Sequence, residues 1–191
     1  MQAPVRVSAA TSTARTADID TVSIGPVLLI HGAMISDEWG CIREHPALAR
    51  YRLIRYRRRG YGGSVAHNGP FSLAQQASDA LGVLTHFGLD RAHVVGQDRA
   101  MTDVGSSLEV EGPALGEWMI SDKDLAGISQ PALTVVGAES IPWLQESVAW
   151  LSDHLPNAET FKLPAAGHML HMIDPDGMAT AIGAFFGRHP L

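Results

Sequence analysis

Residues 93–100 read HVVGQDRA. The apolar start predicts a buried strand, and Gly96 and Ala100 then flank a charged pair, Asp98 and Arg99. A glycine, a reactive side chain and a small residue at this spacing are typical of a sharp strand-to-helix turn, because only small residues fit on its flanks. The segment therefore predicts an exposed carboxylate at the end of a strand. The alternative is that Asp98 only caps the following helix.

Four more short segments predict strands around this one. Residues 27–30 and 133–137 are almost entirely apolar, as in strands buried on both faces, whereas residues 52–56 and 159–163 alternate. Helical patterns separate them, over residues 72–88, 143–155 and 174–187. Ser72 and Gln75 suggest a capping box for the first helix, and its expected apolar face consists of Leu73, Ala77, Leu81, Leu84 and Phe87. Strands joined by helical crossovers predict an α/β fold with a mostly parallel, doubly wound sheet.

The length, charge and cysteine content of the chain exclude some classes of protein. The 191 residues fit a single domain spanning 1–191, in which we expect residues 1–20 to be mobile. A formal net charge of -6 disfavours a nucleic-acid partner, and the single cysteine excludes an internal disulfide. No apolar run approaches the roughly 20 residues of a membrane span, so we expect a cytoplasmic protein without a membrane partner.

Chemically useful residues follow the other predicted strands as well. His31-Gly32-Ala33 comes after residues 27–30, Glu139 comes after residues 133–137, and His168 comes after the last strand. Parallel sheets bind ligands beyond the carboxyl ends of their strands. These residues are therefore candidates for one site.

In these segments the chain resembles the α/β-hydrolase superfamily. Five segments carry the resemblance in the family's chain order: IHGAMISDEW (30–39), YRRRGYGGS (56–64), HVVGQDRA (93–100), PALTVVGAES (131–140) and LPAAGHMLHMIDP (163–175). Together the similar regions cover residues 26–103 and 112–190, which is most of the chain.

The resemblance implies a set of roles. Asp98 stands where most members carry a serine nucleophile, and a carboxylate there resembles the epoxide hydrolase and dehalogenase branches. His168 would be the base, and Glu139 the acid that orients it, although many relatives place the acid one residue later, at Ser140 here. The backbone N–H groups of Ala33 and Arg99 would form an oxyanion hole. Further residues expected to contact substrate are His31, Gly32, Met34, Trp39 and Trp118.

One part of the family pattern is missing. Only 34 residues separate Asp98 from Leu133, too few for the usual further strand and helical cap, so residues 101–118 resemble a shortened remnant of the cap insertion. The expectation is a truncated α/β-hydrolase fold without a cap. Its uncovered apolar residues, Leu115, Trp118 and Met119, would favour a homodimer whose partner subunit closes the site.

The function predicted from these residues is hydrolysis of a small organic molecule, of epoxide or ester type, without a cofactor. Two alternatives remain open: a non-hydrolytic cyclase, lyase or isomerase on the same fold, and a non-catalytic descendant. His168 is alternatively an ordinary surface histidine, and His171 is expected to pack locally. A metal site at His168, His171 and Asp174 is disfavoured for lack of a fourth ligand, and the arginines at 50–59 are mainly interpreted as a solvated face.

Overall fold

The structure is a computed structural model that describes residues 23–32, 38–61, 64, 72–96 and 120–191. It divides into two units, which are described separately. Unit 1 comprises Met1–Glu38, Arg50–Trp118 and Leu191, and unit 2 comprises Trp39–Ala49 and Met119–Pro190.

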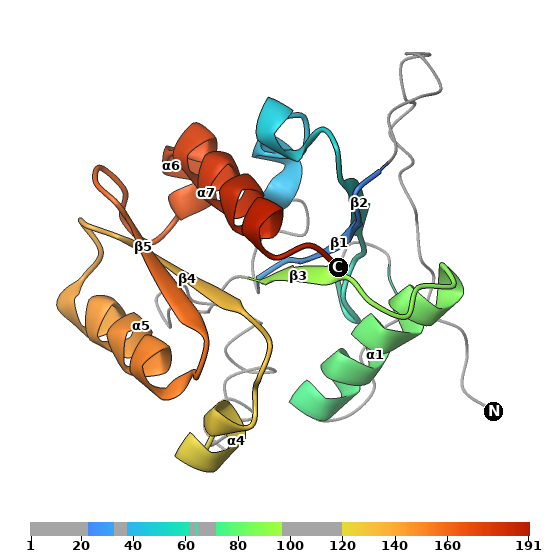
Figure 1. Ribbon diagram of the computed structural model, residues 1–191, viewed down its shortest axis with the longest axis horizontal. Helices are drawn as coiled ribbons and strands as arrows, with labels where there is room; N and C mark the ends of the chain where they lie inside the picture. The colour runs from blue at the N-terminus through green and yellow to red at the C-terminus, as the bar shows by residue number, and fades with distance from the viewer. Residues whose placement is uncertain (1–22, 33–37, 62–63, 65–71, 97–119) are drawn as a thin grey trace. The chain divides into compact units, whose positions relative to one another are not determined.

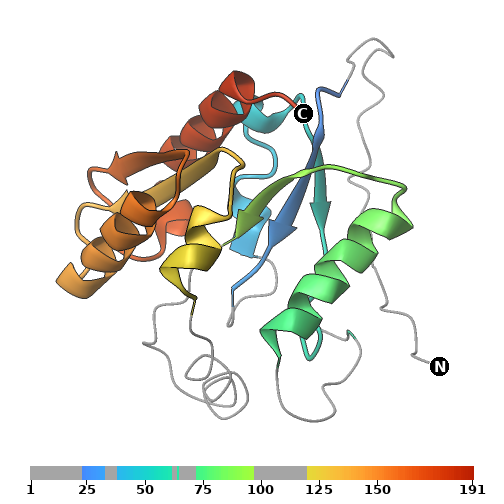
Figure 2. The ribbon, with the colours of Figure 1, turned by 60° about the horizontal axis from the view of Figure 1, so that its bottom comes forward.

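Unit 1 contains a parallel sheet of order β2-β1-β3 (Figures 1 and 2). Its strands are β1 (Pro26–Ile30), β2 (Arg52–Arg55) and β3 (His93–Gly96). The central strand β1 is the most apolar, and Val27, Leu28 and Leu29 are buried as expected for a strand with neighbours on both sides. Each predicted strand of this unit is confirmed to within one residue.

Helix α1 (Leu73–His86) lies alongside this sheet (Figure 2) and packs Val83 against Leu28, Ile54 and Tyr56. Ser72 accepts the Gln75 N–H at its beginning, and Gly88, with φ of 65°, follows its end in the left-handed conformation. The predicted capping box is wrong in its second half, because the Gln75 side chain donates to Asp79 instead of returning to Ser72.

The predicted apolar face of α1 is confirmed at Leu84 and Phe87, which pack against the core of unit 1, and is wrong at Ala77 and Leu81. Leu81 is 65% exposed and Ala77 is exposed, whereas Gln76, Asp79 and Val83 are the buried residues. A prediction from hydrophobicity alone does not place Asp79 on the buried face. Asp79 is ion-paired with Arg59 of the loop after β2, and this pairing offsets the cost of burying the Asp79 carboxylate.

Unit 2 contains the parallel pair β4 (Ala132–Gly137) and β5 (Ala158–Leu163). Helices α5 (Pro142–His154) and α7 (Pro175–Arg188) lie on opposite sides of the two strands (Figure 1). Helix α7 buries Met178, Ile182 and Phe185, whose spacing places them on one face of the helix. The shorter elements are α4 (Asp122–Ala126), α6 (Leu170–Ile173), η2 (Pro46–Leu48) and η1 (Glu38–Cys41), whose first residue belongs to unit 1.

Local sequence explains where these helices begin. At the beginning of α7, the Asp174 side chain accepts the Gly177 N–H at 2.9 Å. Pro175 is the first residue of this helix, where the N–H that proline lacks would have no partner within the helix. Ser121 and Asp124 form a reciprocal capping box at α4, an element that the sequence analysis did not predict. The predicted α/β class with parallel strands is confirmed in both units.

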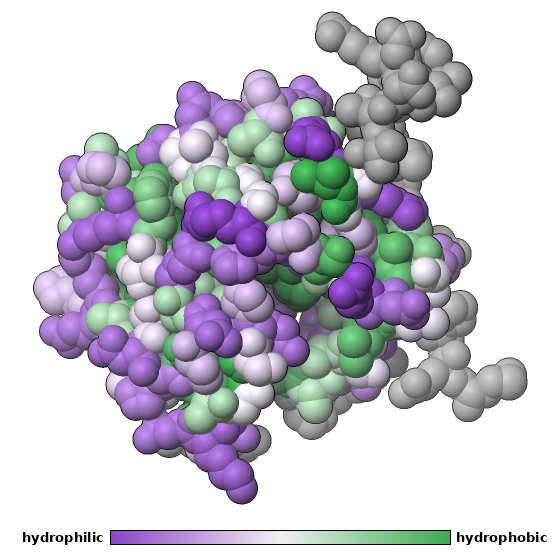
Figure 3. Space-filling model, viewed as in Figure 1, coloured by the Kyte–Doolittle hydropathy of each residue, from purple (hydrophilic) through white to green (hydrophobic). Residues whose placement is uncertain are grey.

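Among the described residues, no helix is long and apolar enough to cross a membrane. The exposed large apolar side chains of unit 2 include Ile141, Trp143 and Trp150, but over the described residues on the face drawn in Figure 3 the hydrophobic patches are small and separated by hydrophilic ones.

Candidate active site

The ends of β1 and β3 are neighbours in unit 1. Ile30 of β1 pairs with Gly96 of β3 in parallel register, so the chain leaves the sheet from adjacent points after each strand. His31 and Gly32 follow the first of these ends, and Asp98 comes two residues after the second in the sequence. Asp98, Arg99, Ala33, Met34 and Trp118 lie outside the described residues, so their predicted roles stay predictions.

Three side chains bind the two backbone groups of Gly32. Its N–H donates to Glu38 Oε1, and its carbonyl oxygen accepts from Arg58 Nη2 at 2.8 Å. His31 Nδ1 lies 2.7 Å from the same oxygen, and His31 Nε2 accepts the Arg58 N–H at 2.9 Å. His31, Gly32, Glu38 and Arg58 are called the Gly32 cluster below.

Burial changes the protonation of this cluster. The pKa of His31 is lowered to about 4, mainly by desolvation and also by the positive charges of Arg58 and Arg57, while the bond to Gly32 opposes the shift. Desolvation raises the pKa of Glu38 to about 7, although the bond from Gly32 and the charge of Arg58 both favour its carboxylate. His31 is therefore neutral at pH 7, and Glu38 titrates near that pH.

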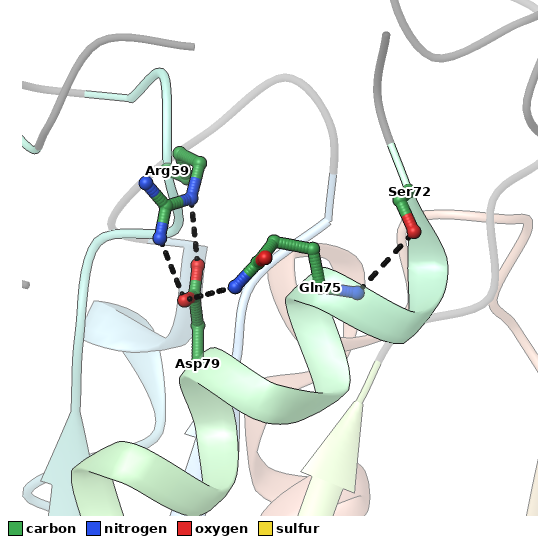
Figure 4. A network of polar contacts seen from close by, with 4 residues as sticks. All are labelled: Arg59, Ser72, Gln75 and Asp79. Atoms are coloured by element: carbon green, nitrogen blue, oxygen red, sulfur yellow. Dashed lines mark hydrogen bonds and ion pairs between the residues drawn. The ribbon is translucent and has the colours of Figure 1, made fainter. Parts of the chain in front are cut away.

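A second polar network attaches the loop after β2 to α1 (Figure 4). Arg59 donates to both oxygens of Asp79, at 3.0 and 2.8 Å, and Gln75 donates to one of them at 3.0 Å. The arginine run is thus only partly a solvated face: Arg50, Arg52 and Arg57 are exposed, but Arg58 is buried and Arg59 is ion-paired.

In unit 2 the loop after β4 and the loop after β5 contact each other through their backbones. Ala138 donates its N–H to Leu163 O at 2.8 Å, and Glu139 donates to Ala166 O at 3.0 Å. Gly137 permits this approach, since a Cβ at that position would lie 2.0 Å from Ala166 O. The structure therefore brings together the loops that carry Glu139 and His168.

The side chains of these loops differ in exposure. Glu139 is exposed and His168 is half-buried, while Ser140 is buried. Gln145 closes the loop after β4 by donating to Ser140 O at 2.7 Å and Ala138 O at 3.3 Å. Glu139 is thus on a turn with defined backbone geometry, and its carboxylate is accessible.

His171, close by in the same unit, packs locally as predicted. It is 1% exposed, and its ring centroid lies 4.9 Å from that of Trp39, which is itself 2% exposed. Burial, together with the nearby charge of His168, lowers the pKa of His171. The contacts described for Trp39 are packing contacts, and its predicted role in substrate binding stays a prediction.

The sequence analysis missed two groups of buried polar residues, one at the Gly32 cluster and one on α1. It did not single out Glu38 or Arg58, although a carboxylate followed by an apolar run at a loop end is a weak hint of burial. It also missed Gln76, which is 7% exposed and has no hydrogen-bond partner for its amide within the described part of the chain. Among the described residues no group of three or more histidine, cysteine or acidic side chains is arranged to hold a metal ion.

Many solved structures are similar to this chain in fold. A thermophilic esterase from Thermogutta terrifontis is 19% identical with a TM-score of 0.72, over 85% of this chain and 89% of that chain. A meta-cleavage product hydrolase from Pseudomonas fluorescens is 18% identical with a TM-score of 0.69, over 86% and 91%. An enol-lactonase from Burkholderia xenovorans is 16% identical with a TM-score of 0.68, over 85% and 91%. No family model and no curated protein sequence matches the chain.

Proposed function

The chain has the α/β-hydrolase fold, and from this premise we propose that it hydrolyses a small organic molecule, with Asp98 as nucleophile, His168 as base and Glu139 as the acid that orients the base. Epoxide opening is the preferred reaction. No cofactor takes part in the proposed steps.

The first step is attack by the Asp98 carboxylate on an sp3 carbon of the substrate. One carboxylate oxygen forms a bond to this carbon, the carbon–oxygen bond of the epoxide breaks, and the released alkoxide takes a proton from water. The product of this step is an alkyl ester of Asp98. The nucleophile must be ionised, and the beginning of a helix after the turn would favour its negative charge.

In the second step water hydrolyses the ester. His168 takes a proton from the water as its oxygen attacks the ester carbonyl carbon, and the tetrahedral intermediate carries an oxyanion. Collapse breaks the bond to the alkyl oxygen, which leaves as an alcohol with the proton from His168. The carboxylic acid that results gives its proton to the hydroxide left from the first step, and one oxygen of the attacking water remains in the Asp98 carboxylate.

The observation that carries the proposal is the backbone pairing of the two loops in unit 2. The Glu139 N–H bond to Ala166 joins the loop of the proposed acid to the loop of the proposed base, independently of either side chain. Each loop follows the carboxyl end of a parallel strand, which is where ligands bind in such sheets.

The test is mass spectrometry of the intact protein after mixing with a panel of small epoxides and esters. We expect a covalent adduct that carries the full mass of an epoxide, transient in the wild type and persistent in His168→Gln. Asp98→Asn should form none and should lose turnover. In a single turnover in ¹⁸O water, the label should enter Asp98.

The other outcomes identify the alternatives. Turnover of an ester in Asp98→Asn would overturn the nucleophile and favour direct hydrolysis of esters or lactones, the activities named for two of the similar structures. Lost turnover in Asp98→Asn without any adduct in His168→Gln would favour an acid–base cyclase, lyase or isomerase. Wild-type protein that turns over no member of the panel would leave a non-catalytic role as the better interpretation.

A further inference from the structure

The Gly32 cluster is a demanding arrangement for a loop. Glu38 is 5% exposed, His31 is 3% exposed and Arg58 is 8% exposed, so three ionisable side chains are buried around one glycine. Burying such groups costs free energy unless each is bonded, and the bonds described for this cluster include those to the backbone groups of Gly32 and Arg58. Closing a turn alone would not need ionisable side chains.

The geometry determines where the protons are. His31 Nε2 accepts a backbone N–H, so this nitrogen carries no proton, and Nδ1 is the nitrogen that donates to Gly32 O. The Gly32 oxygen therefore accepts two hydrogen bonds, one from the His31 imidazole and one from the Arg58 guanidinium at 2.8 Å. Together these two bonds use both lone pairs of the oxygen. Glu38 occupies the Gly32 N–H at the same time.

Holding a carbonyl oxygen also orients the peptide group to which it belongs. A trans peptide unit is planar, and its C=O and the following N–H point in opposite directions. The groups that bind the Gly32 oxygen thus restrain the peptide unit that this oxygen belongs to, and the bond from Gly32 N to Glu38 restrains the preceding unit. Ala33 is the next residue in the sequence, and its N–H is the donor assigned to the oxyanion in the proposed reaction.

We propose that Glu38 and Arg58 are positioning residues for the oxyanion-binding loop: they act through the Gly32 peptide and touch no substrate atom. This inference rests on the proposed function for its catalytic consequence. It predicts an effect confined to the second step, because attack on an sp3 carbon generates no oxyanion on Asp98, whereas hydrolysis of the ester does. Neither residue is assigned a role by the resemblance described above.

The test compares Glu38→Leu with Glu38→Gln. Leucine removes the acceptor for the Gly32 N–H, whereas glutamine keeps an oxygen at the same reach and should restore wild-type behaviour. The matched control is Glu44→Leu, the same change at a glutamate whose side chain is 80% exposed. Arg58→Met serves as the second variant, because it removes the donor to the Gly32 oxygen.

Two readouts are needed, and one does not depend on activity. In ¹⁵N-labelled protein, the Gly32 amide should exchange with solvent about tenfold faster or more in Glu38→Leu than in the wild type, and Glu38→Gln should stay close to the wild type. In rapid-quench mass spectrometry, adduct formation should be unchanged in Glu38→Leu and Arg58→Met, while adduct hydrolysis should slow by about 10²-fold.

Each result decides between the claims. Unchanged Gly32 exchange in Glu38→Leu would overturn the positioning role, whatever the reaction. Faster exchange with normal adduct hydrolysis would overturn its link to the oxyanion. Absence of any adduct in His168→Gln would contradict the proposed function instead, and faster Gly32 exchange in Glu38→Leu would still support the role of Glu38 in holding the loop.

Discussion

Glu139 donates its backbone N–H to the carbonyl oxygen of Ala166 at 3.0 Å. This bond, with the neighbouring one from Ala138 to Leu163, extends the β4–β5 pairing past the ends of both strands. The backbone of the loop after β5 is therefore fixed at Ala166, two residues before His168. A loop on a rigid scaffold of this kind is where functional side chains are commonly found.

Substitution of Gly137 by alanine should disrupt this contact. The added Cβ would lie 2.0 Å from Ala166 O and 2.5 Å from Gly167 O, and backbone atoms cannot rotate away. We expect a loss of about 2–4 kcal/mol in unfolding free energy, measured by urea denaturation. Gly82→Ala in α1 is the control: its Cβ would meet nothing within 4 Å, and the change should be neutral or stabilise by up to about 1 kcal/mol. Equal stability of the two variants would contradict the close approach.

Glu139→Gln should reduce turnover by about tenfold to a hundredfold while leaving stability unchanged. The glutamine keeps the exposed side chain but cannot stabilise a positive charge on His168 during ester hydrolysis. Steady-state kinetics on the substrate identified by the panel, together with thermal unfolding, measure both quantities. Glu146→Gln on α5 is the control for an exposed carboxylate of the same unit. If both variants kept full activity, Glu139 would not be the acid, and the role would have to be sought elsewhere.

Asp79→Asn should destabilise unit 1. The carboxylate is 5% exposed and accepts two bonds from Arg59, so its neutralisation leaves a partly buried guanidinium without its charge partner. We expect a loss of about 3 kcal/mol by chemical denaturation. Glu44→Gln removes one partner of the exposed pair with Arg43 and should change stability by less than about 0.5 kcal/mol. A comparably small effect at Asp79 would show that this network contributes little.

The stability of the protein should depend on pH through His31. Burial lowers its pKa from 6.5 to about 4, so its contribution is fully present above pH 6.5 and is lost as the pH falls through 4. His31→Gln keeps an acceptor and a donor but does not titrate. The advantage of the wild type over this variant should therefore shrink by about 3 kcal/mol between pH 7 and pH 4. Urea denaturation across this range measures it, and a difference that did not vary with pH would contradict the prediction.

Glu38 should produce the opposite pH dependence. Its folded pKa is raised from 4.5 to about 7, so its contribution is fully present below pH 4.5 and is lost as the pH rises through 7. Relative to the wild type, Glu38→Gln should gain about 3 kcal/mol in unfolding free energy between pH 4.5 and pH 7.5. The same denaturation series detects it. A wild-type advantage that grew over this interval would mean that Glu38 is better stabilised as a carboxylate than its burial indicates.

Strand positions could be predicted to within about one residue, because a short apolar run between turn residues is a local signal. The sequence also predicted which strand each loop follows: His31 comes after β1, Glu139 after β4 and His168 after β5. The face that α1 buries could be predicted only in part, at Leu84 and Phe87. Its burial of Gln76 and Asp79 depends on Arg59, whose loop lies 20 residues earlier than Asp79 in the sequence.

The amino-acid sequence alone was sufficient for the parallel α/β class and for placing Glu139 and His168 in the loops after β4 and β5, because hydrophobic periodicity and turn residues act over a few positions. The tertiary structure was needed to find that Gly137 faces Ala166, and that Glu38 and Arg58 hold the two sides of Gly32. It was also needed to assign His31 as neutral at pH 7. Protonation and loop geometry depend on desolvation and on which groups meet in space, and neither is encoded in the spacing of residues along the chain.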